Sequence, residues 1–144
     1  MSSHYLVHAN IALAKFPFDS PQMASFFEQV ARINQIAYDT KGFIDEPELI
    51  DKGSYFNEPY LLNVTRWQSI DALKNFTYRS DHAAVMQART QWFLPQDGAK
   101  YVLFWLPSNT TPSEQTIAER LEQITQEGPS RNAFNFKHPY AAPQ

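Results

Sequence analysis

Residues 61–76, LLNVTRWQSIDALKNF, join a strand to a helix and point to the class of fold. Leu62 and Val64 alternate with the positions between them, and this period of two predicts a strand. Ser69 then stands where the N-cap of a helix belongs. The apolar residues that follow recur at helical spacing: Ile70, Leu73 and Phe76. The stretch therefore predicts a strand that leads directly into a helix.

The second face of this predicted strand carries an unusual combination of side chains. Asn63 and Thr65 are polar, whereas Trp67 at the next alternate position is large and mostly apolar. A polar strand face is normally exposed to solvent, but a tryptophan on such a face would leave a large apolar surface in water. We therefore expect this face to be enclosed.

The chain before this stretch predicts another strand and another helix. Residues 4–13 alternate with a period of two and place His8 and Asn10 on the same face. Residues 19–21, DSP, offer a helix cap followed by a proline at the first helical position. The helix should end before Gly42. Its buried stripe would consist of Met23, Phe26, Phe27, Val30, Ile33 and Ala37.

The connections and the last strand follow from turn residues and from apolar runs. Residues 42–45, GFID, could form a short strand, whereas residues 47–59 are polar and predict a long hairpin connection. Ser80 resembles a second cap, so the helix should bend or restart before residues 81–93. Residues 100–107, KYVLFWLP, are apolar on both faces, which is typical of a strand covered on both sides.

The C-terminal part predicts one more helix and a docked tail. Thr111 and Glu114 have the spacing of a capping box, with Pro112 at the first helical position, and Gly128 should end the helix. An aromatic-rich tail argues for docking onto the body of the protein. The aromatic residues of the tail are Phe134, Phe136 and Tyr140.

The order strand, helix, strand, strand, helix, strand is that of the ferredoxin-like split βαβ fold in the α+β class. We expect one barrel-forming domain over residues 1–108, with the helix and tail of residues 109–144 packed on it. Both main helices cover one face of the sheet, so the opposite face needs a cover. The C-terminal helix could cover part of this face, but the remaining elements are too few to cover it fully, and a second copy related by a two-fold axis is the economical solution. We therefore expect a homodimer that forms an α/β barrel.

Composition narrows the function classes. The chain has 144 residues, of which 43% are hydrophobic and 19% charged, so we expect a globular protein. A net charge of −3 favours neither nucleic acid nor an anionic membrane as partner. The absence of cysteine removes disulfides and thiolate chemistry. No signal-type N-terminus and no long apolar run is visible, so we expect a cytoplasmic protein.

Nearly the whole chain resembles a bacterial family catalogued as a domain of unknown function. The resemblance rests on HYLVHANIA, VTRWQSIDALKNFTYRSDHAAVMQARTQWF, YVLFWLP and EGPSRNAFNFKHPY. That family is related to the dimeric α/β-barrel superfamily of antibiotic-biosynthesis monooxygenases and haem-degrading enzymes. The resemblance implies the ferredoxin-like barrel fold, whose members carry out different chemistry.

We expect the enclosed polar face to lie away from the helices and to line a cavity. In the split βαβ order the first and third strands are neighbours at the sheet centre, so their side chains can converge. A general-base role suits the imidazole of His8. The set expected on this face is His8, Asn10, Asn63, Thr65 and Trp67.

The resemblance implies roles for part of this set. Asn63 and Trp67 resemble the Asn/Trp pair of cofactor-free monooxygenases that oxidise polycyclic phenols to quinones. In that interpretation Asn63 bonds the substrate oxygen, Trp67 forms an apolar wall, and Phe76 and Trp105 add to the substrate lining. The ligand would be an apolar, aromatic or polyketide-like molecule, and no cofactor would be needed. Leu73 stands where that family has a Tyr.

Three other interpretations stay open. Trp67 could be a core residue and Asn63 could bond a neighbouring strand or turn. His82, in the first turn of a helix, could be the axial ligand of haem, because the helix N-terminus favours a neutral imidazole. The haem-degrading relatives match Asn10 on the first strand but place a Trp where this chain has Phe76. Finally, the barrel could bind a hydrophobic ligand without turnover.

Overall fold

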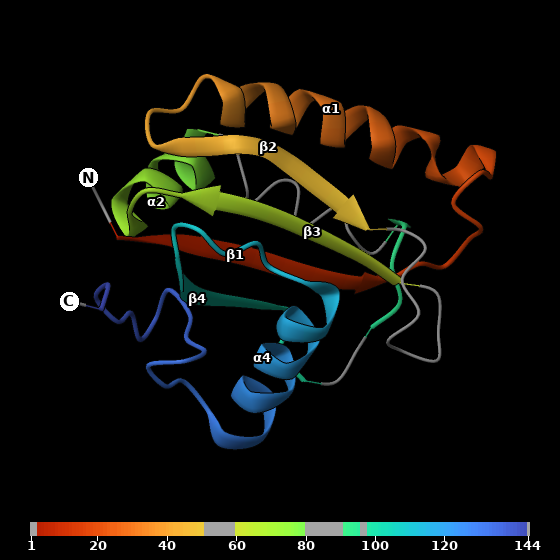
Figure 1. Ribbon diagram of the computed structural model, residues 1–144. Helices are drawn as coiled ribbons and strands as arrows, with labels where there is room; N and C mark the ends of the chain where they lie inside the picture. Colours follow the sequence, from red (N-terminus) through yellow and green to blue (C-terminus); the bar gives the residue numbers. More distant parts are fainter. Residues whose placement is uncertain (1–2, 51–59, 80–90, 96–97, 144) are drawn as a thin grey trace.

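The computed structural model describes residues 3–50, 60–79, 91–95 and 98–143, with the side chains of 46–50 left out. Local sequence patterns account for most of its elements (Figure 1). The elements are β1 (His4–Leu13), a 3₁₀ turn (Pro21–Met23), α1 (Ala24–Tyr38), β2 (Phe43–Ile50), β3 (Tyr60–Trp67), α2 (Ile70–Arg79), β4 (Tyr101–Pro107) and α4 (Glu114–Glu127).

The strands form one 4-stranded sheet in the order β2-β3-β1-β4. Each neighbouring pair is antiparallel, and β1 and β3 occupy the centre. This is the ferredoxin-like α+β arrangement that the order of elements predicted, and it confirms the expected fold class.

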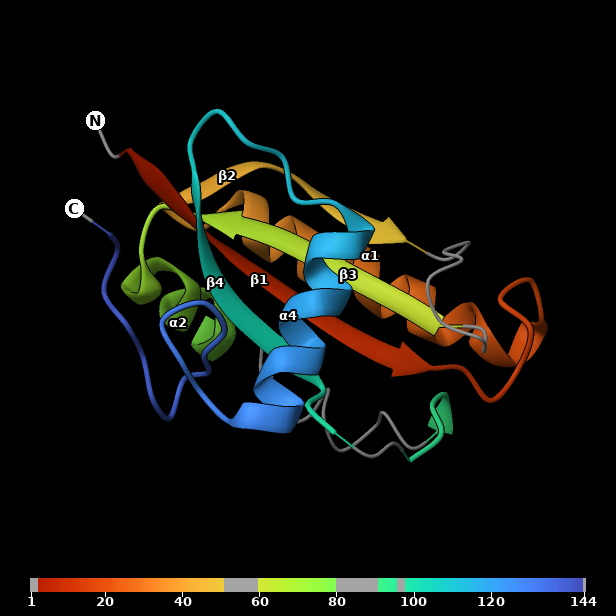
Figure 2. The ribbon, with the colours of Figure 1, turned by 60° about the horizontal axis from the view of Figure 1, so that its bottom comes forward.

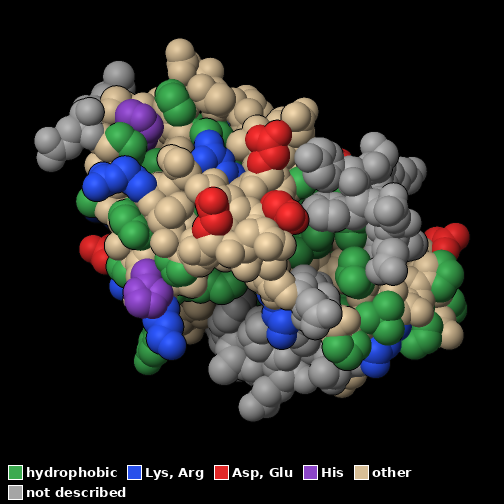
Figure 3. All heavy atoms as spheres, turned by 90° about the horizontal axis from the view of Figure 1, so that it is seen from below, with side chains coloured by type: hydrophobic (Ala, Val, Ile, Leu, Met, Phe, Trp, Pro, Cys, Tyr) green, Lys and Arg blue, Asp and Glu red, His purple; other side chains and the backbone are tan. Residues whose placement is uncertain are grey.

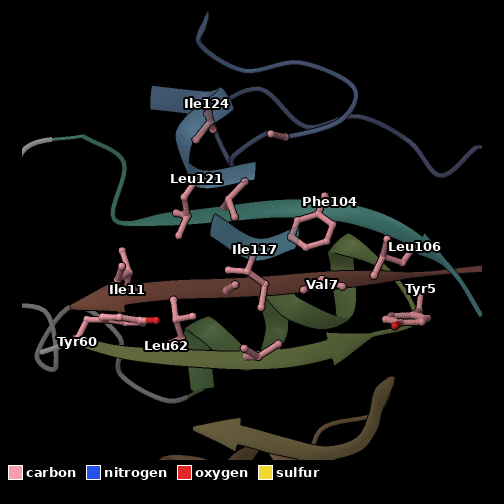
Figure 4. Packing of buried hydrophobic residues seen from close by; sticks show 14 residues of the cluster. Tyr5, Val7, Ile11, Tyr60, Leu62, Phe104, Leu106, Ile117, Leu121 and Ile124 are labelled. Atoms are coloured by element: carbon pink, nitrogen blue, oxygen red, sulfur yellow. The ribbon is translucent and has the colours of Figure 1, made fainter. Parts of the chain in front are cut away.

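Helices cover both faces of the sheet. Figure 2 shows α4 in front of the sheet, with α1 and α2 behind it. Three apolar side chains of α4, Ile117, Leu121 and Ile124, pack on the sheet in one cluster (Figure 4). The sheet side chains of that cluster include Val7, Ile11, Tyr60, Leu62, Val64, Val102 and Phe104.

The cover supplied by α4 corrects part of the sequence interpretation. We expected a second copy to cover this face, but Val7 and Val102 are 0% exposed within the single chain. Glu119 and Glu122 of α4 are exposed. The molecule seen from below, the side on which α4 lies in Figure 1, shows acidic side chains on its surface (Figure 3). The face that motivated the dimer is therefore occupied by the chain's own helix. The homodimer itself stays a prediction.

Strand β2 is longer than the sequence predicted. We expected a connection from residue 47, whereas the strand continues to Ile50. The pairing of β2 with β3 shifts register between Ile44 and Glu48, and Asp45 has a positive φ of 58°. Arg66 of β3 pairs with Asp45 at 2.7 Å beside this irregularity. Because a bulge interrupts the period of two, the alternation that reveals a strand is lost there.

Helix starts were predicted with mixed success. The Ser69 cap is confirmed, because the Ala72 amide donates to its hydroxyl at 3.1 Å. The α4 cap is two residues later than predicted: the hydroxyl of Ser113, in place of Thr111, accepts from the Thr116 amide at 3.1 Å. The predicted second cap at Ser80 lies outside the described residues.

The tail docks on the body, as predicted. Phe134 is 0% exposed, and its backbone exchanges two hydrogen bonds of 2.8 Å with Leu103 of β4. The indole N–H of Trp105 donates to the carbonyl oxygen of Tyr140 at 2.9 Å. The tail thus extends the edge of the sheet next to β4.

Candidate functional site

The predicted polar side chains lie in neighbouring rows at the centre of the sheet. Asn10 is directly opposite Asn63, and His8 is opposite Thr65. On the other side of β1, Tyr101 of β4 is the partner of Asn10. Because side chains on a strand alternate between faces, these residues share one face of the sheet, as predicted.

This face is the one that α1 and α2 cover, and the prediction that it lies away from the helices is wrong. Trp67 belongs to a buried cluster with Leu73 and Phe76 of α2 and with Ala37 of α1. Alternation shows which residues share a face, but it does not show which face the helices will cover. That choice depends on packing between distant segments.

Trp67 is a core residue. Its side chain is 0% exposed, and its ring lies 5.0 Å from that of Phe43 and 4.9 Å from that of Phe76. The indole N–H donates to the hydroxyl of Thr65 at 2.9 Å. Trp67, Thr65 and Phe76, all predicted at the site, therefore lie in the core between the sheet and α2, where Trp67 is hydrogen-bonded to Thr65 and packed on Phe76.

A second apolar cluster closes the opposite end of the same face. Met23 is 0% exposed and packs with Leu61, Trp92 and Phe93. The ring of Phe26 from α1 meets that of Phe93 edge-on at 4.9 Å. The polar rows of the sheet therefore lie between two apolar clusters, both of which involve α1.

Two buried amide atoms between these clusters have no hydrogen-bond partner. They are Oδ1 of Asn10 on the sheet and Oε1 of Gln29 on α1, and no other buried side-chain nitrogen or oxygen in the described part of the chain is unpaired. Gln29 follows Phe26 by three residues and precedes Ile33 by four, and these two belong to the two clusters. Helical spacing thus places Gln29 on the side of α1 that faces the sheet.

Sequence reasoning missed Gln29. The predicted stripe of α1 passed through Val30 instead, because an apolar residue fits the stripe better than a glutamine. The signal was a glutamine at helical spacing between two apolar positions. The sequence by itself gave no reason to expect that its oxygen is buried without a partner.

His8 is half-buried and lies among aromatic rings. Its ring centroid is 5.8 Å from that of Tyr101 and 6.3 Å from that of Phe136 in the tail. The Phe136 amide donates to the Tyr101 hydroxyl at 3.1 Å. Trp105, which we expected in the lining, is half-buried and donates its N–H to the tail. Sequence reasoning missed Phe136 because the tail had no predicted position, and Tyr101 because its strand is apolar on both faces and gave no sign of a site.

Haem and metal binding find no support among the described residues. His82, the predicted axial ligand, lies outside them. No group of His, Cys, Asp or Glu side chains within the described ranges could hold a metal ion. Over the same ranges, no helix combines the length and the apolar character that crossing a membrane requires.

Solved structures with a similar fold include oxygenases. SnoaB from Streptomyces nogalater, a cofactor-independent oxygenase, aligns with a TM-score of 0.50 and 14% identity over 78% of this chain and 100% of its own. A Nitrosomonas europaea protein with the provisional assignment of antibiotic biosynthesis monooxygenase aligns with a TM-score of 0.53 and 7% identity, over 78% of this chain and 97% of its own.

A conserved protein from Methanosarcina mazei aligns with a TM-score of 0.51 and 12% identity, covering 73% of this chain and 93% of its own. At such identities the likeness shows a shared fold and no more. No curated protein matches the chain in sequence. One family profile matches residues 5–144, nearly the whole chain. The chain therefore belongs to the family described as the domain of unknown function DUF3291.

Proposed function

We propose that the protein is a cofactor-free, monooxygenase-like enzyme that acts on an apolar aromatic molecule bound between the sheet and α1. The observation that carries the proposal is the pair of buried, unpaired amide oxygens of Asn10 and Gln29. Leaving a buried polar atom unpaired costs about 1–3 kcal/mol, so each such atom needs a partner, which can be a water or a ligand. The enol hydroxyl of a bound aromatic ketone would donate a hydrogen bond to such an oxygen.

The surroundings suit an aromatic skeleton. Apolar clusters flank the polar rows on both sides, and the rings of Tyr101 and Phe136 stand beside His8. Ligand sites typically combine an apolar lining with a few placed polar groups that fix orientation. Asn10, Asn63 and His8 would be those groups here.

The chemistry follows from these residues. The imidazole of His8 would remove a proton from a ring CH₂ that lies across the central ring from a carbonyl group, and the amide N–H groups of Asn63 and Asn10 would stabilise the resulting aromatic enolate oxygen. The electron-rich carbanion would reduce dioxygen, which the proposal requires as co-substrate. One oxygen atom becomes the new carbonyl and the other leaves as water, so CH₂ and O₂ give C=O and H₂O. Trp67 would contribute an apolar wall only.

The similarity to SnoaB supports the proposal at the level of the fold. Its fold is shared at 14% identity, and that protein is an oxygenase that needs no cofactor. The barrel can therefore carry oxygenase chemistry without a prosthetic group. The residues of this chain have to provide the rest of the support.

Oxygen uptake tests the proposal. Anthrone, an enolisable aromatic ketone, is mixed with the purified protein in an oxygen electrode, and the rate is compared with that of uncatalysed autoxidation. Asn63→Ala should lower the turnover rate about 10²–10³-fold, which is typical for the loss of one oxyanion donor. Asn75→Ala, an exposed asparagine on α2, is the matched control and should leave the rate unchanged.

Two outcomes would contradict enzymatic activity. If wild-type protein takes up no oxygen beyond the autoxidation rate, the monooxygenase proposal fails. If anthrone binds but is not turned over, the protein is a hydrophobic-ligand carrier on the same site.

A further inference from the structure

The ring of Phe136 contacts residues of the predicted site and also lines a hollow on the protein surface. On one side it contacts His8, with ring centroids 6.3 Å apart, and Tyr101, at 5.7 Å. On the other side it lines a hollow together with Lys74, Thr77 and Tyr78 of α2. Tyr78 is 89% exposed, so this hollow opens to solvent.

The hollow has room for part of an aromatic ligand. Its volume is about 320 Å³, at the lower end of the range of roughly 300–1,000 Å³ found for ligand pockets. Its exposed lining is almost entirely apolar. An aromatic ring that reached this hollow from the His8 side would have to replace the phenyl ring of Phe136.

The backbone around Phe136 is held independently of its side chain. Two residues earlier, Phe134 exchanges two 2.8 Å hydrogen bonds with Leu103, and the Phe136 amide donates to the Tyr101 hydroxyl at 3.1 Å. A substitution at position 136 therefore changes the ring and leaves the docking of the tail in place.

We propose that Phe136, supplied by the C-terminal tail, determines how large an aromatic ligand can bind next to His8. This inference rests on the proposed function, because it concerns the same site. The ring stands between the hollow on α2 and the side chains of His8 and Tyr101, so a smaller side chain at this position would extend the hollow towards His8. A larger side chain at position 136 would fill more of the hollow.

Binding of ligands of graded size tests this inference without turnover. Dissociation constants for 1-naphthol, anthrone and 5,12-dihydrotetracen-5-one, which have two, three and four fused rings, are measured by isothermal titration under nitrogen. Phe136→Ala should raise the affinity for the four-ring ligand relative to the two-ring ligand at least tenfold. Phe136→Trp should lower the same ratio.

Tyr140→Ala is the matched control, because it removes another tail aromatic. The Tyr140 ring packs on that of Phe134, at 5.7 Å, whereas the rings of His8 and Tyr101 pack on Phe136. The size ratio should stay at the wild-type value in this variant. Thermal melts of all variants check that they fold. If Phe136→Ala loses stability, Phe136→Trp still tests the inference, because the size ratio should change in the opposite direction in that variant.

The binding measurements distinguish a failure of this inference from a failure of the proposed function. If wild-type protein binds none of the three ligands, the proposed site is wrong and the inference falls with it. If wild-type protein binds them and both Phe136 variants keep the wild-type size ratio, the site stands and the role of Phe136 is refuted.

Discussion

Asn10→Leu should make the protein more stable and less able to bind ligand. Oδ1 of Asn10 is buried without a partner, so the folded protein has lost hydration of that oxygen and gained no hydrogen bond. Replacing the amide by an apolar group of similar shape relieves a penalty of about 1–3 kcal/mol. Allowing for imperfect packing of the new methyl groups, we expect the free energy of unfolding to rise by about 1–2 kcal/mol.

Urea unfolding followed by circular dichroism measures this change, and Asn75→Leu at an exposed helix position is the control. The control should change the free energy of unfolding by less than about 0.5 kcal/mol. Anthrone at 100 times its dissociation constant should stabilise the wild-type protein by about 2.7 kcal/mol and the Asn10→Leu variant by much less. A Gln29→Leu variant should behave in the same way, since its oxygen is also unpaired.

The reverse result would refute this reasoning. If Asn10→Leu lowers the free energy of unfolding by more than about 1 kcal/mol, the amide makes hydrogen bonds that stabilise the fold. Asn10 would then be a structural residue, and the main support for the proposed site would be lost.

Three further predictions concern other parts of the molecule. The Tyr60 hydroxyl donates to the Glu114 carboxylate at 2.5 Å and ties α4 to the sheet, so Tyr60→Phe should lower the free energy of unfolding in urea by about 1.5 kcal/mol. Burial raises the pKa of Tyr5 above its usual 10.0, so the unfolded state loses this proton first. Stability should therefore fall as the pH rises above about 10, and Tyr5→Phe should flatten that part of the curve. If the protein binds haem, added hemin should give a Soret band that His82→Ala abolishes. A hemin spectrum that the wild-type protein leaves unchanged would exclude haem binding.

The sequence determined the local elements and their order. Strands β1, β3 and β4 follow from alternation and from apolar runs, and the Ser69 cap from its position before a helical stripe. These signals are local, because side-chain periodicity and backbone capping depend on near neighbours in the chain. Since the order of elements permits few topologies, it also predicted that His8 and Asn10 would lie beside Thr65 and Asn63.

Predictions from the sequence failed where the structure of one segment depends on its contacts with a distant segment. The bulge at Asp45 interrupts the alternation of β2, and the cap of α4 is Ser113 in place of Thr111. The sequence pattern could not distinguish a sheet face covered by α4 from one covered by a second copy, since both arrangements bury the same apolar side chains.

Only the tertiary structure decided which face of the sheet is the candidate site. Trp67 lies beneath α2 because its ring fits against Phe43 and Phe76, and this fit places the polar rows inside the fold. The same packing buries the amides of Asn10 and Gln29 without partners and brings Phe136 to His8. Such contacts join residues far apart in the chain, and their energies depend on shape and burial, which a pattern of residue types does not encode.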